Sequence, residues 1–181
     1  MVGAGRGWLL ACVVTDGGGV RHGSESWGSE EHGLAAGKRA GGPPNLDMGL
    51  ERRLDTFVRE AVGERLLRSA HDYAEGGIAI ALAESCLLGD IGATVGIDEL
   101  RPDEGLNPRS AGILFGESQS RFLISFATEA LVRLHELAGR HSVPLRDLGS
   151  VGGGRLRVTA CIDVSLADVR RAHEGALIER E

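Results

Sequence analysis

The sequence predicts a single layered α/β domain over residues 46–181. Segments with helical periodicity alternate there with short apolar segments typical of strands. One of these strands, Phe122–Phe126, is apolar on both faces, as strands in the interior of a sheet are. Residues 1–45 differ sharply in composition, because they hold 12 of the 28 glycines. We therefore predict that residues 1–45 form a Gly-rich tail that is disordered or lies outside the fold.

The first half of the predicted domain contains two helices and two strands. Asn45 or Asp47 can cap the first helix, which has a single apolar stripe. The second helix is apolar nearly all round, so we expect it to be buried on most sides. The predicted elements are, in order, a helix from Leu50 to Leu66, a strand at Leu66–Ala70, a helix at Ile78–Leu88 and a strand at Ile91–Ile97.

The second half continues the alternation and adds a hairpin. Thr128 is predicted to cap a helix that carries Leu131, Leu134 and Leu137, and Ser165 opens the last helix with a capping box closed by Asp168. The glycines 152–154 separate two apolar segments, which is a hairpin signal. The segments joined in this way are Pro144–Val151 and Leu156–Ile162.

Charge and cysteine content limit the class of protein. The formal net charge is −6 and the pI is near 5.5, which argues against nucleic acid or an acidic membrane surface as the main partner. No apolar run is long enough to cross a bilayer. Three widely spaced cysteines without a CxxC pair are typical of buried thiols in a reducing compartment. We expect a cytoplasmic protein.

The turn His71–Gly77 joins a predicted strand to a predicted helix. The twin glycines Gly76 and Gly77 would present free backbone N–H groups and the positive end of the helix dipole, which suits an anion. Asp72 and Glu75 would repel a bare phosphate but could hold one through Mg²⁺. The alternative is a tight turn whose carboxylates only cap the helix.

A second polar cluster, Glu117–Arg121, precedes the predicted interior strand. Arg121 could bind a phosphate or carboxylate with two hydrogen bonds, and Glu117 and Gln119 could bind a sugar or an amide. The alternative is a loop whose side chains satisfy its own backbone. His71 and Asp72 are adjacent on a strand and point to opposite faces, which argues against a catalytic dyad.

Four segments, taken in order and spacing, resemble the C-terminal end of the synthetase subunit of phosphoribosylformylglycinamidine synthase, a member of the aminoimidazole-ribonucleotide-synthetase-like superfamily. The resemblance covers about residues 41–181. The segments are Gly42-Pro43-Pro44-x-Leu46-Asp47, the stretch from Arg68 to Glu84 with His71-Asp72-x-x-Glu75-Gly76-Gly77, Leu114–Arg121 with Gly116-Glu117-Ser118-Gln119, and Leu148-Gly149-x-Val151-Gly152-Gly153.

The resemblance implies a C-terminal α/β lobe with a mixed sheet flanked by helices. It implies an ATP-dependent carbon–nitrogen ligase that converts formylglycinamide ribonucleotide to formylglycinamidine ribonucleotide, with Mg and ATP as cofactors. By resemblance, Asp72 binds Mg²⁺, and no residue of this lobe is assigned as catalytic. The residues implied to face substrate or nucleotide are His71, Glu75, Gly76, Gly77, Glu117, Ser118, Gln119 and Arg121.

The resemblance also implies partners. These are the ATP-binding lobes, a separate glutaminase subunit and a small accessory subunit, as in synthetases of the small type. Residues 1–40 cannot supply an ATP-binding lobe, so we expect the isolated chain to be a fragment without activity of its own. The alternative is a stand-alone, non-enzymatic binding or interaction module derived from the same lobe.

Overall fold

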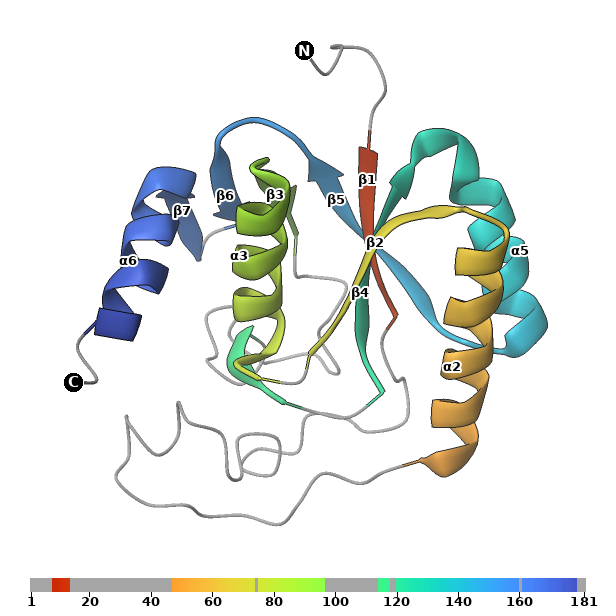
Figure 1. Cartoon of the computed structure of the whole chain (residues 1–181). Coiled ribbons are helices and arrows are strands. Elements are labelled where there is room, and N and C mark those ends of the chain that lie inside the picture. The colour runs from red at the N-terminus through yellow and green to blue at the C-terminus, as the bar shows by residue number, and fades with distance from the viewer. Residues whose placement is uncertain are drawn as a thin grey trace.

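A computed structural model describes residues 8–13, 47–73, 75–96, 114–117, 120–159 and 161–178. Seven strands form one mixed sheet in the order β2-β4-β1-β5-β3-β6-β7, and helices lie on both of its faces (Figure 1). All neighbouring strands are antiparallel except β3 and β6. The predicted α/β class is therefore confirmed. The elements are β1 (Trp8–Val13), α2 (Met48–Gly63), β2 (Leu67–Asp72), α3 (Gly77–Gly89), β3 (Ala93–Val95), β4 (Phe122–Ala127), η2 (Thr128–Ala130), α5 (Leu131–His141), β5 (Leu145–Val151), β6 (Arg155–Val158), β7 (Ile162–Ser165) and α6 (Leu166–Ile178).

The sheet separates two hydrophobic cores. Helices α2 and α5 pack against each other over one face, and α3 and α6 pack against each other on the other side. The α2–α5 core is built around Phe57, Phe126 and Leu137, and the α3 core around Ile78 and Leu82; all five are at most 1% exposed. Within the described ranges, no helix is both long enough and apolar enough to cross a membrane.

Strand β1 corrects the predicted domain boundary. Residues 8–13 belong to the segment that the sequence assigned to a tail outside the fold, yet they pair with both β4 and β5 near the middle of the sheet. Leu10 faces the α3 core and Ala11 faces the α2–α5 core, and both side chains are buried. The tail prediction is thus wrong for residues 8–13. The rest of residues 1–45 lies outside the described residues.

The predicted hairpin between β5 and β6 is also wrong, because β3 lies between these two strands. Backbone hydrogen bonds join the residue before β3 to the glycines after β5: Gly152 N donates to Gly92 O at 2.7 Å, and Gly92 N donates to Gly153 O at 2.8 Å. Gly92 has room for no side chain, since a Cβ there would lie 2.2 Å from Arg155 O. The hairpin of this region is formed instead by β6 and β7.

Two of the predicted helix caps are confirmed. Asp47 Oδ1 accepts hydrogen bonds from the backbone N–H groups of Gly49 at 2.8 Å and Leu50 at 3.0 Å. These bonds, the one from Leu50 first, lower the pKa of the Asp47 carboxyl. Ser165 Oγ accepts from Asp168 N at 3.1 Å at the start of α6.

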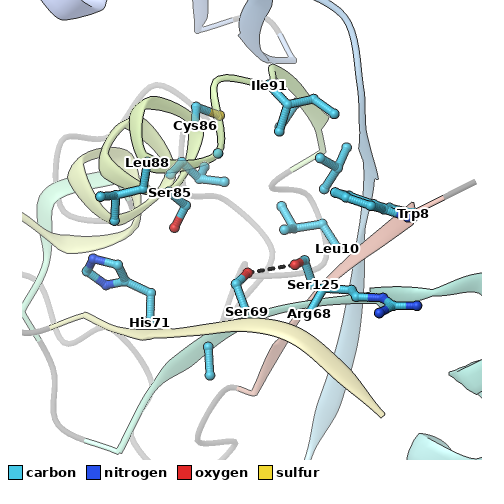
Figure 2. Close-up of a pocket in the computed structure, with 15 residues that line it drawn as sticks. Trp8, Leu10, Arg68, Ser69, His71, Ser85, Cys86, Leu88, Ile91 and Ser125 are labelled. Carbon is cyan, nitrogen blue, oxygen red and sulfur yellow. Dashed lines mark hydrogen bonds between the residues drawn. The ribbon is translucent and has the colours of Figure 1, made fainter. Parts of the chain in front are cut away.

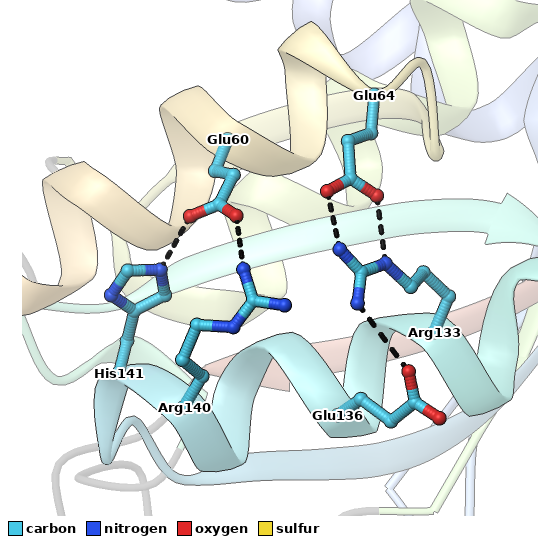
Figure 3. A network of polar contacts seen from close by, with 6 residues as sticks. All are labelled: Glu60, Glu64, Arg133, Glu136, Arg140 and His141. Atoms are coloured by element: carbon cyan, nitrogen blue, oxygen red, sulfur yellow. Dashed lines mark hydrogen bonds and ion pairs between the residues drawn. The ribbon is translucent and has the colours of Figure 1, made fainter.

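Ion pairs fasten α2 to α5 on the surface (Figure 3). Arg133 donates twice to the Glu64 carboxylate, at 2.8 and 2.6 Å, in the bidentate geometry that guanidinium favours. This contact lowers the pKa of the Glu64 carboxyl. One turn earlier in α2, Glu60 accepts from Arg140 at 2.5 Å and contacts His141 Nε2 at 2.7 Å. Glu60 in α2 and Glu64 just after its last residue thus link this helix to α5 on the same face of the sheet.

Candidate functional site

The turn between β2 and α3 requires its two glycines. Gly76 and Gly77 have φ angles of +71° and +64°, in the left-handed region that other residues rarely adopt. A Cβ on Gly77 would lie 2.7 Å from the carbonyl carbon of Phe115 and 2.8 Å from Leu114 O. The glycines therefore allow both the turn and the close approach of the segment that leads to Glu117.

Glu117 closes this turn. The Gly76 backbone N–H donates to Glu117 Oε1 at 3.0 Å, so the structure brings together two polar motifs that are 41 residues apart in the chain. Gly76 is the N-cap of α3, where the helix dipole and orphan N–H groups favour negative charge. The Glu117 carboxylate thus accepts from one of the N–H groups that the sequence predicted would bind an external anion.

Asp72 and Glu75 flank the turn and are both exposed. The Asp72 side chain is 60% exposed at the end of β2. No group of three His, Cys, Asp or Glu side chains suited to a metal ion is found among the described residues. Asp72 fits Mg²⁺ only in the way typical of nucleotide sites, where one carboxylate and the phosphates share the ion with water.

His71 is held toward α3 rather than toward the turn. Its Nδ1 lies 2.6 Å from Asp72 O, and its Nε2 lies 3.0 Å from Glu84 Oε2 on α3. The Asp72 carboxylate is 3.8 Å from Nδ1, so the neighbouring acid makes only a loose contact with the ring. That these two residues do not form a catalytic dyad stays a prediction.

The segment before β4 is tied to α2. Ser120 has a φ of +61°, and its hydroxyl donates to the Glu51 carboxylate. Arg121 follows, partly buried, immediately before β4. Ser118 and Gln119, which the sequence placed in the site, lie outside the described residues.

A pocket of about 450 Å³ lies between the C-terminal half of α3 and strands β2, β4 and β1 (Figure 2). Sequence reasoning missed it. Its polar residues include Arg68, Ser69 and His71, which lie in the second of the four resembling segments, but nothing in that segment predicted that they line a pocket. The register of β2 on β4 pairs Ser69 with Ser125, and the two Oγ atoms lie 2.6 Å apart. Only that pairing, across 56 residues of sequence, could have revealed the floor of the pocket.

Cys86 also lines this pocket, but its thiol is not poised for chemistry. The residue is 4% exposed, and burial raises the pKa of the thiol to about 11. A thiol with so high a pKa is almost entirely protonated at neutral pH and is a poor nucleophile. The prediction of a buried thiol is confirmed at this position.

The mixed sheet, the helices on both faces and the glycine turn closed by Glu117 define a layered α/β lobe. The chain belongs to the family of AIR synthase related proteins, C-terminal domain, which matches residues 12–161. Its match begins inside β1, which agrees with the presence of that strand in the fold.

Known relatives carry the name that the sequence resemblance suggested. The phosphoribosylformylglycinamidine synthase subunit PurL of Thermomicrobium roseum is 40% identical over 151 residues, which are 83% of this chain and 20% of that protein. The chain thus spans about a fifth of the length of the curated relatives it matches. The resemblance predicted from the four motifs is confirmed.

Solved structures show the same fold. The structure of PurLQS from Thermotoga maritima matches with a TM-score of 0.68 at 22% identity, covering 91% of this chain and 26% of that one. T. maritima PurL complexed with ATP matches with a TM-score of 0.66 at 22% identity, covering 92% and 26%. The complex with FGAR matches with a TM-score of 0.68 at 23% identity, covering 92% and 28%.

Proposed function

We propose that this chain is the C-terminal lobe of an ATP-dependent carbon–nitrogen ligase of purine biosynthesis, which forms formylglycinamidine ribonucleotide. The observation that carries the proposal is the 40% identity to a PurL subunit over 83% of the chain. The fold shared with T. maritima PurL, whose structures include complexes with ATP and FGAR, supports it. The partners would be ATP-binding lobes, a glutaminase subunit and a small accessory subunit, acting in the cytoplasm.

Within this function, the turn at α3 would face the ligand. Asp72 would contribute one carboxylate to a Mg²⁺ ion held mainly by phosphate oxygens, with Glu75 beside it. Glu117 would keep the turn closed through Gly76 N, at the observed 3.0 Å. Ser118, Gln119 and Arg121 would contact the ribonucleotide or a nucleotide. His71, held by Glu84, would position the end of β2 rather than react.

The 181 residues by themselves would not catalyse the reaction. Phosphoryl transfer depends on groups that clamp Mg–ATP and stabilise the charge that develops on the phosphate. The described residues offer a single exposed aspartate at the turn and no cluster for a metal ion. The lobe would therefore become active only beside an ATP-binding lobe.

A chimera tests this function directly. The segment of this chain that aligns with the T. roseum relative over 151 residues replaces its counterpart in that protein, and amidine formation is measured with formylglycinamide ribonucleotide, ATP, Mg²⁺ and ammonia. We expect product from the chimera and none from the 181-residue chain alone.

Matched variants of the chimera test the site. Glu117→Gln should reduce kcat/KM about 10-fold or more, because it weakens a charge-assisted bond that shapes the turn. Glu129→Gln, at an exposed position on η2, should leave it unchanged. A chimera that folds and assembles but forms no product would contradict the proposal and favour a non-enzymatic binding module.

A further inference from the structure

The pocket under α3 lies beyond the glycines of the turn, although His71 of β2, one of the residues of the proposed site, belongs to its lining. Its helical wall comes from Leu82, Ser85 and Cys86, further along α3, whereas Gly76 is the N-cap of that helix and Gly77 its first residue. Most of its lining is apolar, and Leu88 stands at its rim with 85% of its surface exposed. A volume of about 450 Å³ is within the range of pockets that bind small organic molecules.

The floor of the pocket carries a hydroxyl pair with hydrogen-bonding capacity to spare. Ser125 is 7% exposed, which is unusual for a polar side chain, and its Oγ lies 2.6 Å from Ser69 Oγ. Two hydroxyls that share one hydrogen bond keep one further hydrogen and several lone pairs. Ser85, on α3, points toward the same space (Figure 2). A bound molecule would therefore find both a donor and an acceptor at the base of an otherwise apolar cavity.

The charge at the pocket favours an anion. Arg68 belongs to the lining and is exposed, and no ion pair is found for it within the described part of the chain. Neither Asp nor Glu contributes to the described lining, and the nearby Glu84 carboxylate is already in contact with His71 Nε2 at 3.0 Å. An anionic group beside Arg68 would thus gain a charge-assisted hydrogen bond without an opposing carboxylate in the lining.

We propose that this pocket binds an organic anion built on one or two rings. The rings would lie between Leu10 and Leu82, a polar ring atom would bond the Ser69–Ser125 pair, and the anionic group would bind Arg68. The proposal does not depend on the ligase function, because the binding can be measured on the 181-residue chain without ATP or a partner.

Two probes that differ only in the anionic group test the proposal. Indole-3-acetate and indole are titrated into the ¹⁵N-labelled chain, and amide shifts are followed by NMR. Indole-3-acetate should saturate shifts around Ser69, Leu82 and Ser125 with a Kd of about 1 mM or tighter, as expected for a ligand of this size. Indole should bind the same residues about 5- to 10-fold more weakly.

Variants test the roles of Arg68 and of the apolar cavity separately. Arg68→Ala should raise the Kd of indole-3-acetate about 5- to 10-fold and change the Kd of indole by less than about 2-fold. The control Arg52→Ala, on the exposed face of α2, should change neither. Ser85→Trp should fill the cavity and abolish the binding of both probes, with folding checked from the spectrum. The proposal is overturned if neither probe shifts the pocket residues at about 10 mM, or if Arg68→Ala and Arg52→Ala have the same effect.

Discussion

Substituting Gly77 by alanine tests the physical reason for the twin-glycine turn. Two penalties add in this variant. The left-handed φ of +64° costs a residue with a Cβ about 1–2 kcal/mol. The new Cβ would also lie 2.7 Å from backbone atoms of Phe115, which cannot rotate away as a side chain would. Forcing that segment to move should add about 1–3 kcal/mol. We expect a total loss of about 2–5 kcal/mol in the free energy of unfolding, measured by urea denaturation.

Two other glycines separate these penalties. Gly153 has a φ of +72°, but no atom lies within 4 Å of the point that a Cβ would occupy, so Gly153→Ala should cost only the backbone term of about 1–2 kcal/mol. Gly139 lies inside α5 in open space, and Gly139→Ala should stabilise the fold by roughly 0.5–1 kcal/mol. The reasoning would be refuted if Gly77→Ala cost no more than Gly153→Ala, because the close approach of Phe115 would then carry no energy.

Three further outcomes follow from the described contacts. Ala11→Asp should abolish cooperative unfolding, because it places a carboxylate at a fully buried position of β1. An unchanged urea midpoint would show that residues 8–13 are not part of the folded sheet. The Cys86 thiol, with a pKa of about 11, should be about 0.1% ionised at pH 8, so iodoacetamide should label it in the native protein far more slowly than in urea. Hydrogen bonds to Arg133, Arg155 and Ser165 lower the pKa values of the carboxyls of Glu64, Asp163 and Asp168, respectively. The unfolded chain then binds more protons, so thermal stability should be constant near neutral pH and fall as the pH drops below about 4.5; a midpoint independent of pH between about 5 and 3 would contradict this.

Local chemistry made much of the fold predictable. Asp47 caps α2 because a short carboxylate can reach two nearby N–H groups, and Ser165 and Asp168 mark the start of α6 for the same reason. Strand β4 was evident because its residues are apolar on both faces, as burial between two helical layers demands. The glycine pair at the start of α3 was evident as a turn, although the sequence could not tell which atoms crowd it.

Pairings between distant segments could not be predicted in this way. Nothing in the six residues of β1 distinguishes them from an apolar patch in a Gly-rich stretch, because their partners β4 and β5 lie more than 100 residues away. The glycines after β5 indicated a hairpin, but β3 inserts between β5 and β6 and makes the sheet locally parallel.

The sequence by itself determined the family, the α/β class, most of the helices and the glycine turn, since each rests on local propensity or on motifs that stay contiguous in the chain. Only the tertiary structure decided that residues 8–13 lie at the middle of the sheet, that Glu117 closes the turn at Gly76, and that Ser69 and Ser125 meet under α3. These features depend on strand order and register, which are set by burying both faces of the sheet at once. No local segment carries that information alone.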